Sequence, residues 1–223
     1  MTPTDPSHPS TSSDPLPRRD SLRLGAGLAL LAMPALWLSA KAQDGAPLRP
    51  TISQSEGPFY PVRLPADGDA DLTRNGALAP RRGQPVQLDG RLVDLRGKPL
   101  GGLVVEIWQC DADGHYHHPG DGDRADPGFQ GWGRATADAD GRWRFRTIRP
   151  MPYTGRTPHI HVKVKDGRHD LLTTQLYVAG EPGNERDGLY RSIRDPRDRA
   201  ALTVSFEPGP QGPVAQARLV LDT

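Results

Sequence analysis

Two histidines separated by a single residue, His159 and His161, are the first candidates for chemistry. If the segment that contains them is a β-strand, alternate side chains project to one face, so both imidazoles lie together and Ile160 points to the other side. Two imidazoles on one face form a ready pair of metal ligands. The same spacing also occurs in surface histidines and in hydrogen-bonded core histidines, so the pair alone leaves both interpretations open.

Further metal ligands have to come from residues other than cysteine. Cys110 is the only cysteine in the sequence, which excludes an internal disulfide framework and any multi-cysteine zinc or iron–sulfur site. Two of the five tyrosines, Tyr116 and Tyr153, lie in turn-like segments, where a rigid scaffold can aim them inward. A phenolate is a hard anionic ligand, and because the reference pKa of tyrosine is about 10, metal binding has to supply the deprotonation. Two histidines with two tyrosinates favour Fe(III) over Zn(II) or Fe(II), although a single tyrosine more often packs with its hydroxyl hydrogen-bonded.

The elements that must position these residues are predicted to be short β-strands. The sequence holds 25 glycines and 24 prolines but only 6% aromatic residues, which indicates many turns. No long stretch holds the 3.6-residue apolar period of a helix. Alternating apolar runs predict strands at residues 86–93, 103–109, 142–147, 159–165, 172–178, 202–206 and 217–221. Their spacing predicts an all-β fold, a β-sandwich or small barrel, with residues 207–214 as a loop.

The composition sets limits on function. The 223 residues include 28 Lys and Arg against 27 Asp and Glu, which gives a formal net charge of +1. Because there is no overall basic excess, we expect no nucleic-acid partner. Charged residues make up 25% and hydrophobic residues 35%, and the mean hydropathy is −0.62, which is typical of a soluble globular chain.

Residues 1–42 are predicted to be a disordered leader with an export signal rather than a domain. Arg18 and Arg19 form a paired basic start, residues 24–38 carry no charge, and residues 40–42 offer a small-x-small cleavage site. The paired arginines resemble a twin-arginine (Tat) signal, which carries folded proteins and so favours a cofactor inserted before export. A membrane anchor is disfavoured, because the apolar run is shorter than the ~20 residues of a spanning helix and contains a proline.

We therefore expect an exported protein, periplasmic or secreted, that meets the Tat machinery only during export and has no membrane anchor after cleavage. The mature chain is expected to begin with an irregular segment, residues 43–85, that packs on the core. A β-sandwich catalytic domain is expected at residues 86–223.

Four segments share order, spacing and runs of consecutive residues with a known enzyme family. They are TISQSEGPFYP at residues 51–61, residues 99–118 ending in GHYHH, residues 128–164 ending in GRTPHIHVKV, and LTTQLY at residues 172–177. On these segments the chain resembles the intradiol ring-cleavage dioxygenases, and within them the protocatechuate 3,4-dioxygenase-like proteins. The resemblance covers nearly all of residues 51–177.

The resemblance implies a β-sandwich with a mononuclear non-haem Fe(III). Such enzymes use O2 to cleave the bond between the two hydroxyl-bearing carbons of a catechol, giving a cis,cis-muconate-type diacid. By resemblance, the active-site arginine is Arg156 and the glutamine of the following strand is Gln175. The iron ligands fall on Tyr116, Tyr153, His159 and His161.

The resemblance also gives these residues roles. Tyr153 matches the displaceable ligand, which takes one proton from the substrate as a catechol binds. Arg156 is expected to stabilise the negative charge that develops on the ring, with Gln175 assisting by hydrogen bonding. An Arg156→Lys change is expected to fail, because an ammonium group cannot copy the planar fork of a guanidinium.

Several other residue groups look like sites but are interpreted as structural. His115, His117 and His118 flank Tyr116; we interpret them as solvated turn residues and leave open that one lines the mouth of the pocket. The acidic residues Asp121, Asp123 and Asp126 lack the pattern of a calcium loop and are interpreted as loop charges. The residues interpreted as core or packing residues are Trp108, Cys110, Trp132, Trp143 and Phe145.

Two other functions stay open from the sequence. One is an exported β-sandwich binding module without catalysis, and the other is an oxygenase in which a carboxylate completes a two-histidine Fe(II) site. The presence of Tyr116, Tyr153 and Arg156 beside two histidines counts against both. We see no long helical dimerisation region and no partner subunit, so we expect a monomer or a homo-oligomer. The physiological catechol, whether protocatechuate, catechol or a relative, is left open.

Overall fold

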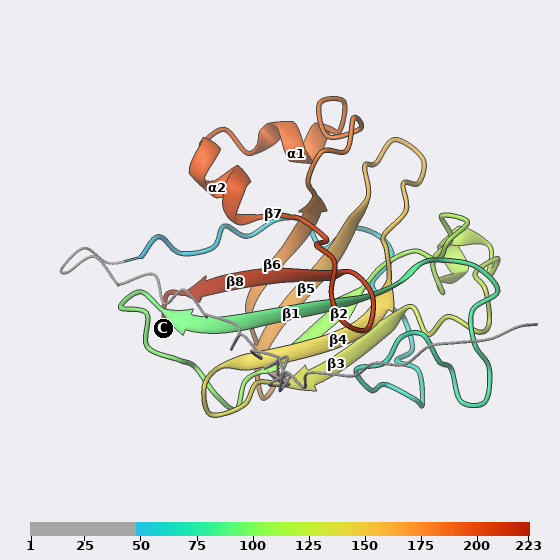
Figure 1. Cartoon of the computed structure of the whole chain (residues 1–223), viewed down its shortest axis with the longest axis horizontal. Helices are drawn as coiled ribbons and strands as arrows, with labels where there is room; N and C mark the ends of the chain where they lie inside the picture. Colours follow the sequence, from blue (N-terminus) through green and yellow to red (C-terminus); the bar gives the residue numbers. More distant parts are fainter. Residues whose placement is uncertain (1–47) are drawn as a thin grey trace, which may run out of the picture. The chain divides into compact units, whose positions relative to one another are not determined.

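The computed structural model of the protein describes residues 48–223, which fold into two β-sheets (Figure 1). The first sheet has three strands in the order β4-β1-β8, and the second has five in the order β3-β2-β5-β6-β7. The predicted signal at residues 1–42 lies outside the described residues. The strands are β1 (Pro85–Asp94), β2 (Val104–Trp108), β3 (Trp132–Thr136), β4 (Arg142–Ile148), β5 (His159–Asp166), β6 (His169–Val178), β7 (Thr203–Val204) and β8 (Val214–Leu221).

Strand alternation decides which residues fill the core. On β5, Ile160, Val162 and Val164 are buried in the main apolar cluster, to which both sheets contribute. Because successive side chains on a strand point to opposite faces, His159 and His161 lie on the outer face of the five-stranded sheet. Complete burial of each core side chain stabilises the fold by about 1.5–3 kcal/mol, and this burial fixes the register that places the histidines.

The predicted all-β sandwich is confirmed, with three differences in its elements. The sequence of β3 has no apolar alternation, and this strand was not predicted. The strand expected at residues 202–206 is shorter, because only Thr203–Val204 pair with β6. Two helices, α1 (Gly188–Ser192) and α2 (Pro196–Ala201), are too short to show a helical period.

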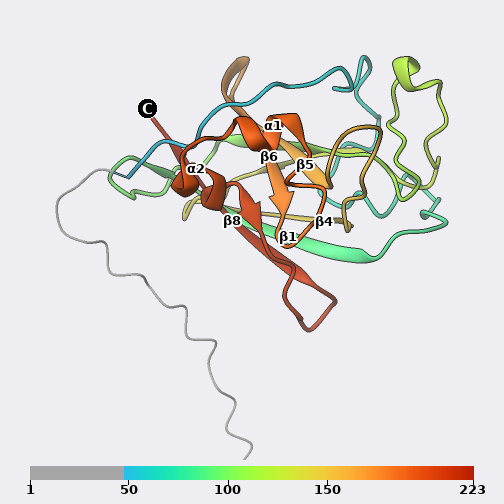
Figure 2. The ribbon, with the colours of Figure 1, turned by 90° about the horizontal axis from the view of Figure 1, so that it is seen from above.

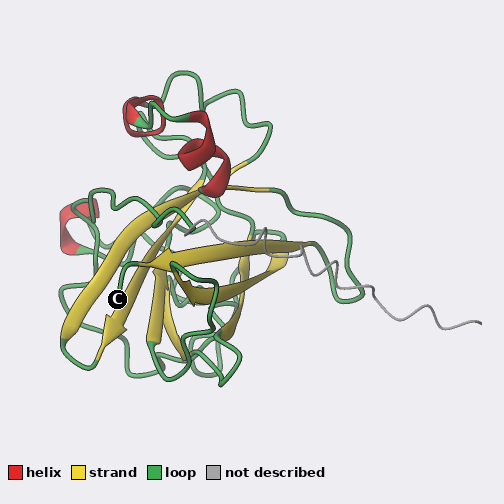
Figure 3. Ribbon diagram, turned by 90° about the vertical axis from the view of Figure 1, so that its left-hand side faces the viewer, coloured by secondary structure: helices red, strands yellow, loops and turns green. Residues whose placement is uncertain are grey.

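The helices lie together on one side of the strand layers (Figure 3). Each begins after an aspartate that caps its first backbone N–H groups, Asp187 for α1 and Asp195 for α2. A one-turn 3-10 helix, η1 (Pro119–Asp121), lies in the loop between β2 and β3. Within residues 48–223, no helix is long and apolar enough to cross a membrane.

The irregular segment that precedes β1 covers the outer face of the five-stranded sheet (Figure 2). The backbone N–H of Gln54 donates to the carbonyl of Thr173, and the Thr174 hydroxyl donates to the carbonyl of Ile52. Farther along the segment, Glu56 forms an ion pair with Lys163 of β5. This cover explains why polar residues on the outer face of the sheet are buried.

Candidate active site

The structure brings the four predicted metal ligands together on the outer face of the five-stranded sheet. His159 and His161 come from β5, and their ring centroids are 4.7 Å apart. Tyr116 follows β2, with its ring 6.2 Å from that of His161. Tyr153 lies in the turn before β5, with its ring 5.5 Å from that of His159 and 5.2 Å from that of Tyr116. The four side chains therefore converge on one small volume.

Both histidines are held neutral. His159 is 1% exposed, and its Nδ1 donates to the carbonyl of Thr157 at 2.6 Å, so its Nε2 carries the lone pair. Burial lowers the pKa of His159 to about 4 and that of His161 well below its usual value. The Nε2 atoms of His159 and His161 lie 3.1 Å apart. Two nitrogens bound at right angles to one metal, each at about 2.1 Å, have a similar separation of about 3 Å.

Tyr116 supplies a buried phenol without a partner. The side chain is 2% exposed, and its hydroxyl has no hydrogen-bond partner among residues 48–223. Burial raises the pKa of the Tyr116 phenol well above its usual value. Its position is fixed by Asp121, which accepts a hydrogen bond from its backbone N–H at 2.7 Å, and by Phe59, whose ring stacks on it at 4.8 Å. A cation is the partner that this oxygen lacks.

Tyr153 differs from Tyr116 because it is only half-buried and has a cationic neighbour. The backbone N–H of Arg156 donates to the carbonyl of Tyr153 at 2.8 Å and closes the turn between them. Nη1 of Arg156 donates to the Tyr153 hydroxyl at 3.4 Å. Burial raises the pKa of the Tyr153 phenol, while the charge of Arg156 opposes that shift. The phenolate of Tyr153 is therefore stabilised by a neighbour that Tyr116 does not have at hydrogen-bond distance.

Arg156 is held from two sides. Its Nε donates to Oδ2 of Asp187 at 2.8 Å, and its Nη2 donates to Oε1 of Gln175 at 2.6 Å. Gln175 is fully buried, and its Nε2 donates to the carbonyl of Ser55 at 2.8 Å. Burial would lower the pKa of Arg156, but Asp187 more than offsets this and the pKa is raised. Gln175 therefore connects Arg156 to the segment that covers the sheet.

Asp187 is a functional residue that the sequence analysis missed. Its side chain is fully buried, and Oδ2 accepts from the backbone N–H of Thr157 at 2.9 Å as well as from Arg156. Its Oδ1 accepts from the backbone N–H groups of Leu189 and Tyr190 and so caps α1. These donors hold the pKa of Asp187 below its usual value, although burial alone would raise it. The sequence signal that could have identified Asp187 is an aspartate in the N-cap position of a short helix.

Comparison with known proteins identifies the family. A family model described as dioxygenase matches residues 55–207. The protocatechuate 3,4-dioxygenase beta chain of Burkholderia cepacia is 34% identical over 181 residues, which cover 74% of this chain and 76% of that protein. The chain belongs to the intradiol ring-cleavage dioxygenase family.

The share of their own length that the chain covers differs among other similar proteins. The catechol 1,2-dioxygenase of Candida albicans is 32% identical over 167 residues, and the chain spans about half of that protein, 52%. One similar solved structure is the dioxygenase domain of a dioxygenase carbohydrate-binding protein fusion from Streptomyces sp. SirexAA-E. It is 35% identical, with a TM-score of 0.61, and the alignment covers 78% of this chain and 99% of that one. An intradiol dioxygenase from Tetranychus urticae, at 22% identity and a TM-score of 0.62 over 78% of this chain and 94% of that one, shares the fold.

The residues interpreted as core or packing residues are buried, and they divide between two clusters. Trp143 and Phe145 are in the main core, as expected. Trp108, Cys110 and Trp132 form a second buried cluster with Tyr116 on the outer face of the five-stranded sheet. The ring of Trp108 stacks on that of His161 at 4.7 Å and 9°, because the two residues are paired in register on neighbouring strands. Strand parity would have placed Trp108 on the side of the histidines.

The three histidines that flank Tyr116 have local roles. His118 accepts a hydrogen bond at Nδ1 from the backbone N–H of Gly120 at 2.9 Å, and His117 donates from Nε2 to the carbonyl of Phe129 at 2.5 Å. His117 is exposed and lines a pocket of about 220 Å³ that also borders Tyr116. His115 is only half-buried. None of the three belongs to a described group that could bind a metal through His, Cys, Asp or Glu.

The acidic loop residues also have structural roles. Asp121 positions Tyr116, as described above, and Oδ2 of Asp126 accepts a hydrogen bond from the backbone N–H of Arg81. Across residues 48–223, no three His, Cys, Asp or Glu side chains gather as a metal site. A metal at the two histidines would therefore need ligands of another type, and the phenols of Tyr116 and Tyr153 lie beside the histidines. The donor set of two neutral imidazoles and two phenols fits a hard trivalent cation such as Fe(III).

Proposed function

We propose that the chain cleaves catechol-type aromatics such as protocatechuate or catechol between their hydroxyl-bearing carbons, using O2 and a mononuclear non-haem Fe(III). The proposed ligands are Tyr116, Tyr153, His159 and His161. The observation that supports this most strongly is the convergence of two neutral, buried imidazoles with the half-buried phenol of Tyr153 and the buried phenol of Tyr116, whose hydroxyl lacks a hydrogen-bond partner among the described residues. The relatives named as protocatechuate and catechol dioxygenases support the substrate class.

The bound ion would supply Lewis-acid activation of a chelated catechol. The protein's own residues contribute first by fixing which ligand atoms carry a proton. His159 keeps its proton on Nδ1 through the carbonyl of Thr157, which leaves Nε2 free to act as a ligand. Tyr116 is a permanent ligand in this proposal, because its side chain is only 2% exposed and is packed among other buried rings.

Tyr153 is the proposed exchangeable ligand and proton acceptor. It lies in a turn, is only half-buried, and has Arg156 at its hydroxyl. When a catechol binds, the phenolate oxygen of Tyr153 accepts one substrate proton and moves away as a phenol. The partly exposed turn gives this side chain room that Tyr116, at 2% exposure, does not have.

Arg156 is the proposed stabiliser of negative charge on the substrate ring. Asp187 and Gln175 hold its guanidinium in one orientation, so little reorganisation is needed when charge develops. Both ends of the Gln175 amide are engaged, one by Arg156 and one by the carbonyl of Ser55. We therefore assign Gln175 to positioning Arg156 rather than to direct contact with the substrate.

The test is a visible spectrum and an iron determination on the purified protein, followed by anaerobic addition of catechol and of protocatechuate. We expect a red-brown absorption band at one iron per chain, because tyrosinate bound to Fe(III) absorbs visible light, and a shift of the band when a catechol binds. Admission of O2 should then give a muconate-type diacid. A protein that stays colourless after reconstitution with iron would remove Tyr116 and Tyr153 as ligands.

The two alternative functions predict different results. A binding module without catalysis would bind a catechol but consume no O2. An Fe(II) oxygenase would need a carboxylate beside the histidines, and no such group of His, Cys, Asp and Glu side chains occurs in residues 48–223. The donor set therefore supports the Fe(III) enzyme.

We also propose export through the Tat pathway, supported by the sequence of residues 1–42, which lie outside the described part of the chain. Replacement of Arg18 and Arg19 by lysines should retain the protein in the cytoplasm, as measured by cell fractionation. Equal export of the variant and the native chain would contradict the use of this pathway.

A further inference from the structure

The outer face of the three-stranded sheet is rich in arginine. The strands β8, β1 and β4 lie side by side in Figure 1. Their apolar residues, such as Leu88 and Phe145, point into the core, so the alternate residues point outward. The outward-facing residues in the middle of this sheet are Gln87, Asp89, Arg91, Arg142, Arg144, Arg146, Gln216 and Arg218.

The strand register places three of these arginines in one row. Arg91 is directly opposite Arg142 on one neighbouring strand and directly opposite Arg218 on the other. Like charges in directly opposite positions destabilise a sheet. The row is only partly neutralised: Asp140 pairs with Arg142 and its carbonyl accepts from Nε of Arg91, while Arg218 has no ion-pair partner among residues 48–223.

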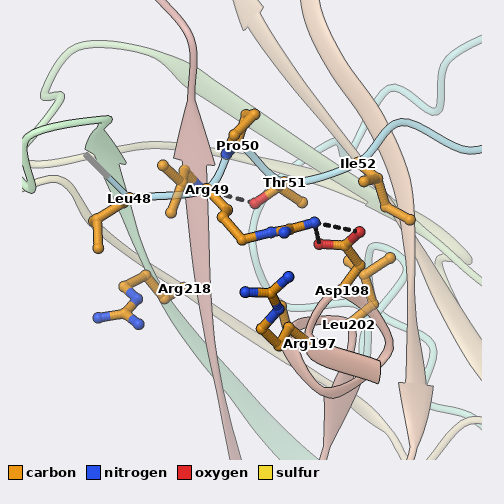
Figure 4. A pocket seen from close by; sticks show the side chains of 11 residues that line it. Leu48, Arg49, Pro50, Thr51, Ile52, Arg197, Asp198, Leu202 and Arg218 are labelled. Carbon is orange, nitrogen blue, oxygen red and sulfur yellow. Dashed lines mark hydrogen bonds and ion pairs between the residues drawn. The ribbon is translucent and has the colours of Figure 1, made fainter. Parts of the chain in front are cut away.

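The row continues into a pocket. Arg218 lines a pocket of about 190 Å³ together with Arg49 and Arg197 (Figure 4). Arg49 forms ion pairs with Asp195 at 3.0 Å and Asp198 at 3.1 Å, and Arg197 pairs with Asp195 at 3.1 Å. Three arginines against two aspartates leave this pocket with a formal excess of positive charge.

We propose that this basic track, which consists of Arg142, Arg91, Arg218, Arg197 and Arg49, binds a linear acidic polysaccharide whose sugars carry carboxylates. The track is a line across three strands that ends in a pocket, which matches an extended polymer better than the plane of a membrane. Guanidinium groups bind carboxylates through two parallel hydrogen bonds. The proposal does not depend on ring cleavage.

The acidic residues along the track favour a sugar polymer over a nucleic acid. Asp140, Asp195 and Asp198 lower the net positive charge of the track, which disfavours the densely charged phosphate backbone of a nucleic acid more than a polymer with one carboxylate per sugar. The same carboxylates can accept hydrogen bonds from sugar hydroxyls, which a uronic acid carries beside its carboxylate. The described large apolar side chains that are exposed all lie off the track, so nothing there would insert into lipid or stack on bases: Val62, Leu64, Leu78, Met151 and Leu171.

The test is calorimetric titration of the full-length protein with polygalacturonate at low salt. We expect binding that weakens as salt is added, and an affinity at least ~10-fold lower in the double variant Arg91→Gln/Arg218→Gln. The matched control is Arg74→Gln/Arg168→Gln, which removes the same charge from exposed positions away from the track. The control should change the affinity less than ~2-fold.

Three results would overturn the proposal: no binding of polygalacturonate, an equal loss of affinity in the control, or tighter binding of duplex DNA or of anionic lipid vesicles. The variant is expected to fold, because Arg91→Gln removes two like-charge contacts and should raise the Tm by about 1–3 °C. O2 consumption with a soluble catechol should stay unchanged in the variant. Loss of polymer binding with retained activity therefore separates this proposal from the proposed function.

Discussion

The outer faces of the two sheets both carry polar residues, but these residues are buried on one sheet and exposed on the other. On both, strand alternation places polar residues away from the core. On the five-stranded sheet, the covering segment buries them: Lys163, at 4% exposure, pairs with Glu56 and Asp170 and lies 4.1 Å from the ring of Tyr60. Within residues 48–223, nothing comparable covers the arginines of the three-stranded sheet, and the side chain of Arg144 is 68% exposed.

The difference shows what makes a polar face into a chemical site. Burial moved the pKa of His159 to about 4, and buried partners orient Arg156. On the open face, the outward-pointing arginine side chains are exposed. Burial beside fixed partners therefore pre-organises a side chain such as Arg156 for chemistry, whereas exposure leaves a surface suited to ionic docking.

The largest expected effect is the loss of a proposed ligand on the covered face. His161→Ala should reduce iron from about one per chain to near zero and lower kcat/KM by more than ~10³-fold, because one of two neutral imidazoles is lost. Iron analysis and O2 uptake measure this. A variant that retains both stoichiometric iron and activity would exclude His161 as a ligand. Arg144→Ala on the open face should leave both values unchanged.

The second largest effect is expected on kcat when Arg156 loses the carboxylate that orients it. Asp187→Asn should lower kcat by about 10²-fold with a smaller change in KM, because the guanidinium loses its ionic partner while the Thr157 turn persists. Asp195→Asn is the matched control, since it weakens the cap of α2 without touching the site. Steady-state kinetics of the iron-loaded protein measure the change, as does the NMR signal of the Arg156 Nε–H in the iron-free protein, which we expect to be protected from exchange in the native chain. If both variants lose the same activity, Asp187 acts only as a helix cap.

The covered face should also control acid stability. His159 has a pKa of about 4 in the folded protein and about 6.5 when unfolded, so between these values the unfolded chain binds more protons. The free energy of unfolding of the iron-free protein should therefore fall by about 3 kcal/mol as pH drops from 6.5 to 4. Urea titrations at several pH values test this, and His159→Gln should flatten the dependence. A native profile that is already flat would contradict it.

The smallest effect compares matched carboxylates on the two faces. Glu56→Gln should destabilise the protein by about 1–2 kcal/mol, because Lys163 is buried and keeps only Asp170. Asp89→Asn removes a partner of the exposed Arg144 and should cost less than about 1 kcal/mol. Chemical denaturation measures both. Equal losses would show that the covering segment adds no stability through this ion pair.

The sequence predicted what local patterns encode. The alternation of His159, Ile160 and His161 gave the correct faces, and six of the seven predicted strands match strands of similar length. β3 was missed because Trp132–Thr136 holds polar and small residues that pair with β2 without an apolar stripe. The metal-ligand roles of Tyr116, Tyr153, His159 and His161 stay predictions, although the structure brings the four side chains together.

The contacts that orient the site depend on pairings across the chain. Asp187 is 31 residues from Arg156 in sequence, and Ser55 is 120 residues from Gln175. The local sequence of neither partner shows which residue it contacts, because a contact between distant segments is defined only when the two elements fold together. The burial of Trp108 against His161 likewise required the register of two strands.

Because Asp187 both caps α1 and binds Arg156, local motion of α1 is linked to the site. One oxygen caps α1 and the other holds Arg156, so we expect opening of the first turn of α1 to loosen the carboxylate that holds the guanidinium. Local unfolding of five residues would then switch the site off while both sheets stay intact. Amide hydrogen exchange at Leu189 and Tyr190 would report how often this happens, and any molecule that stabilises α1 would raise the fraction of protein with Arg156 in position.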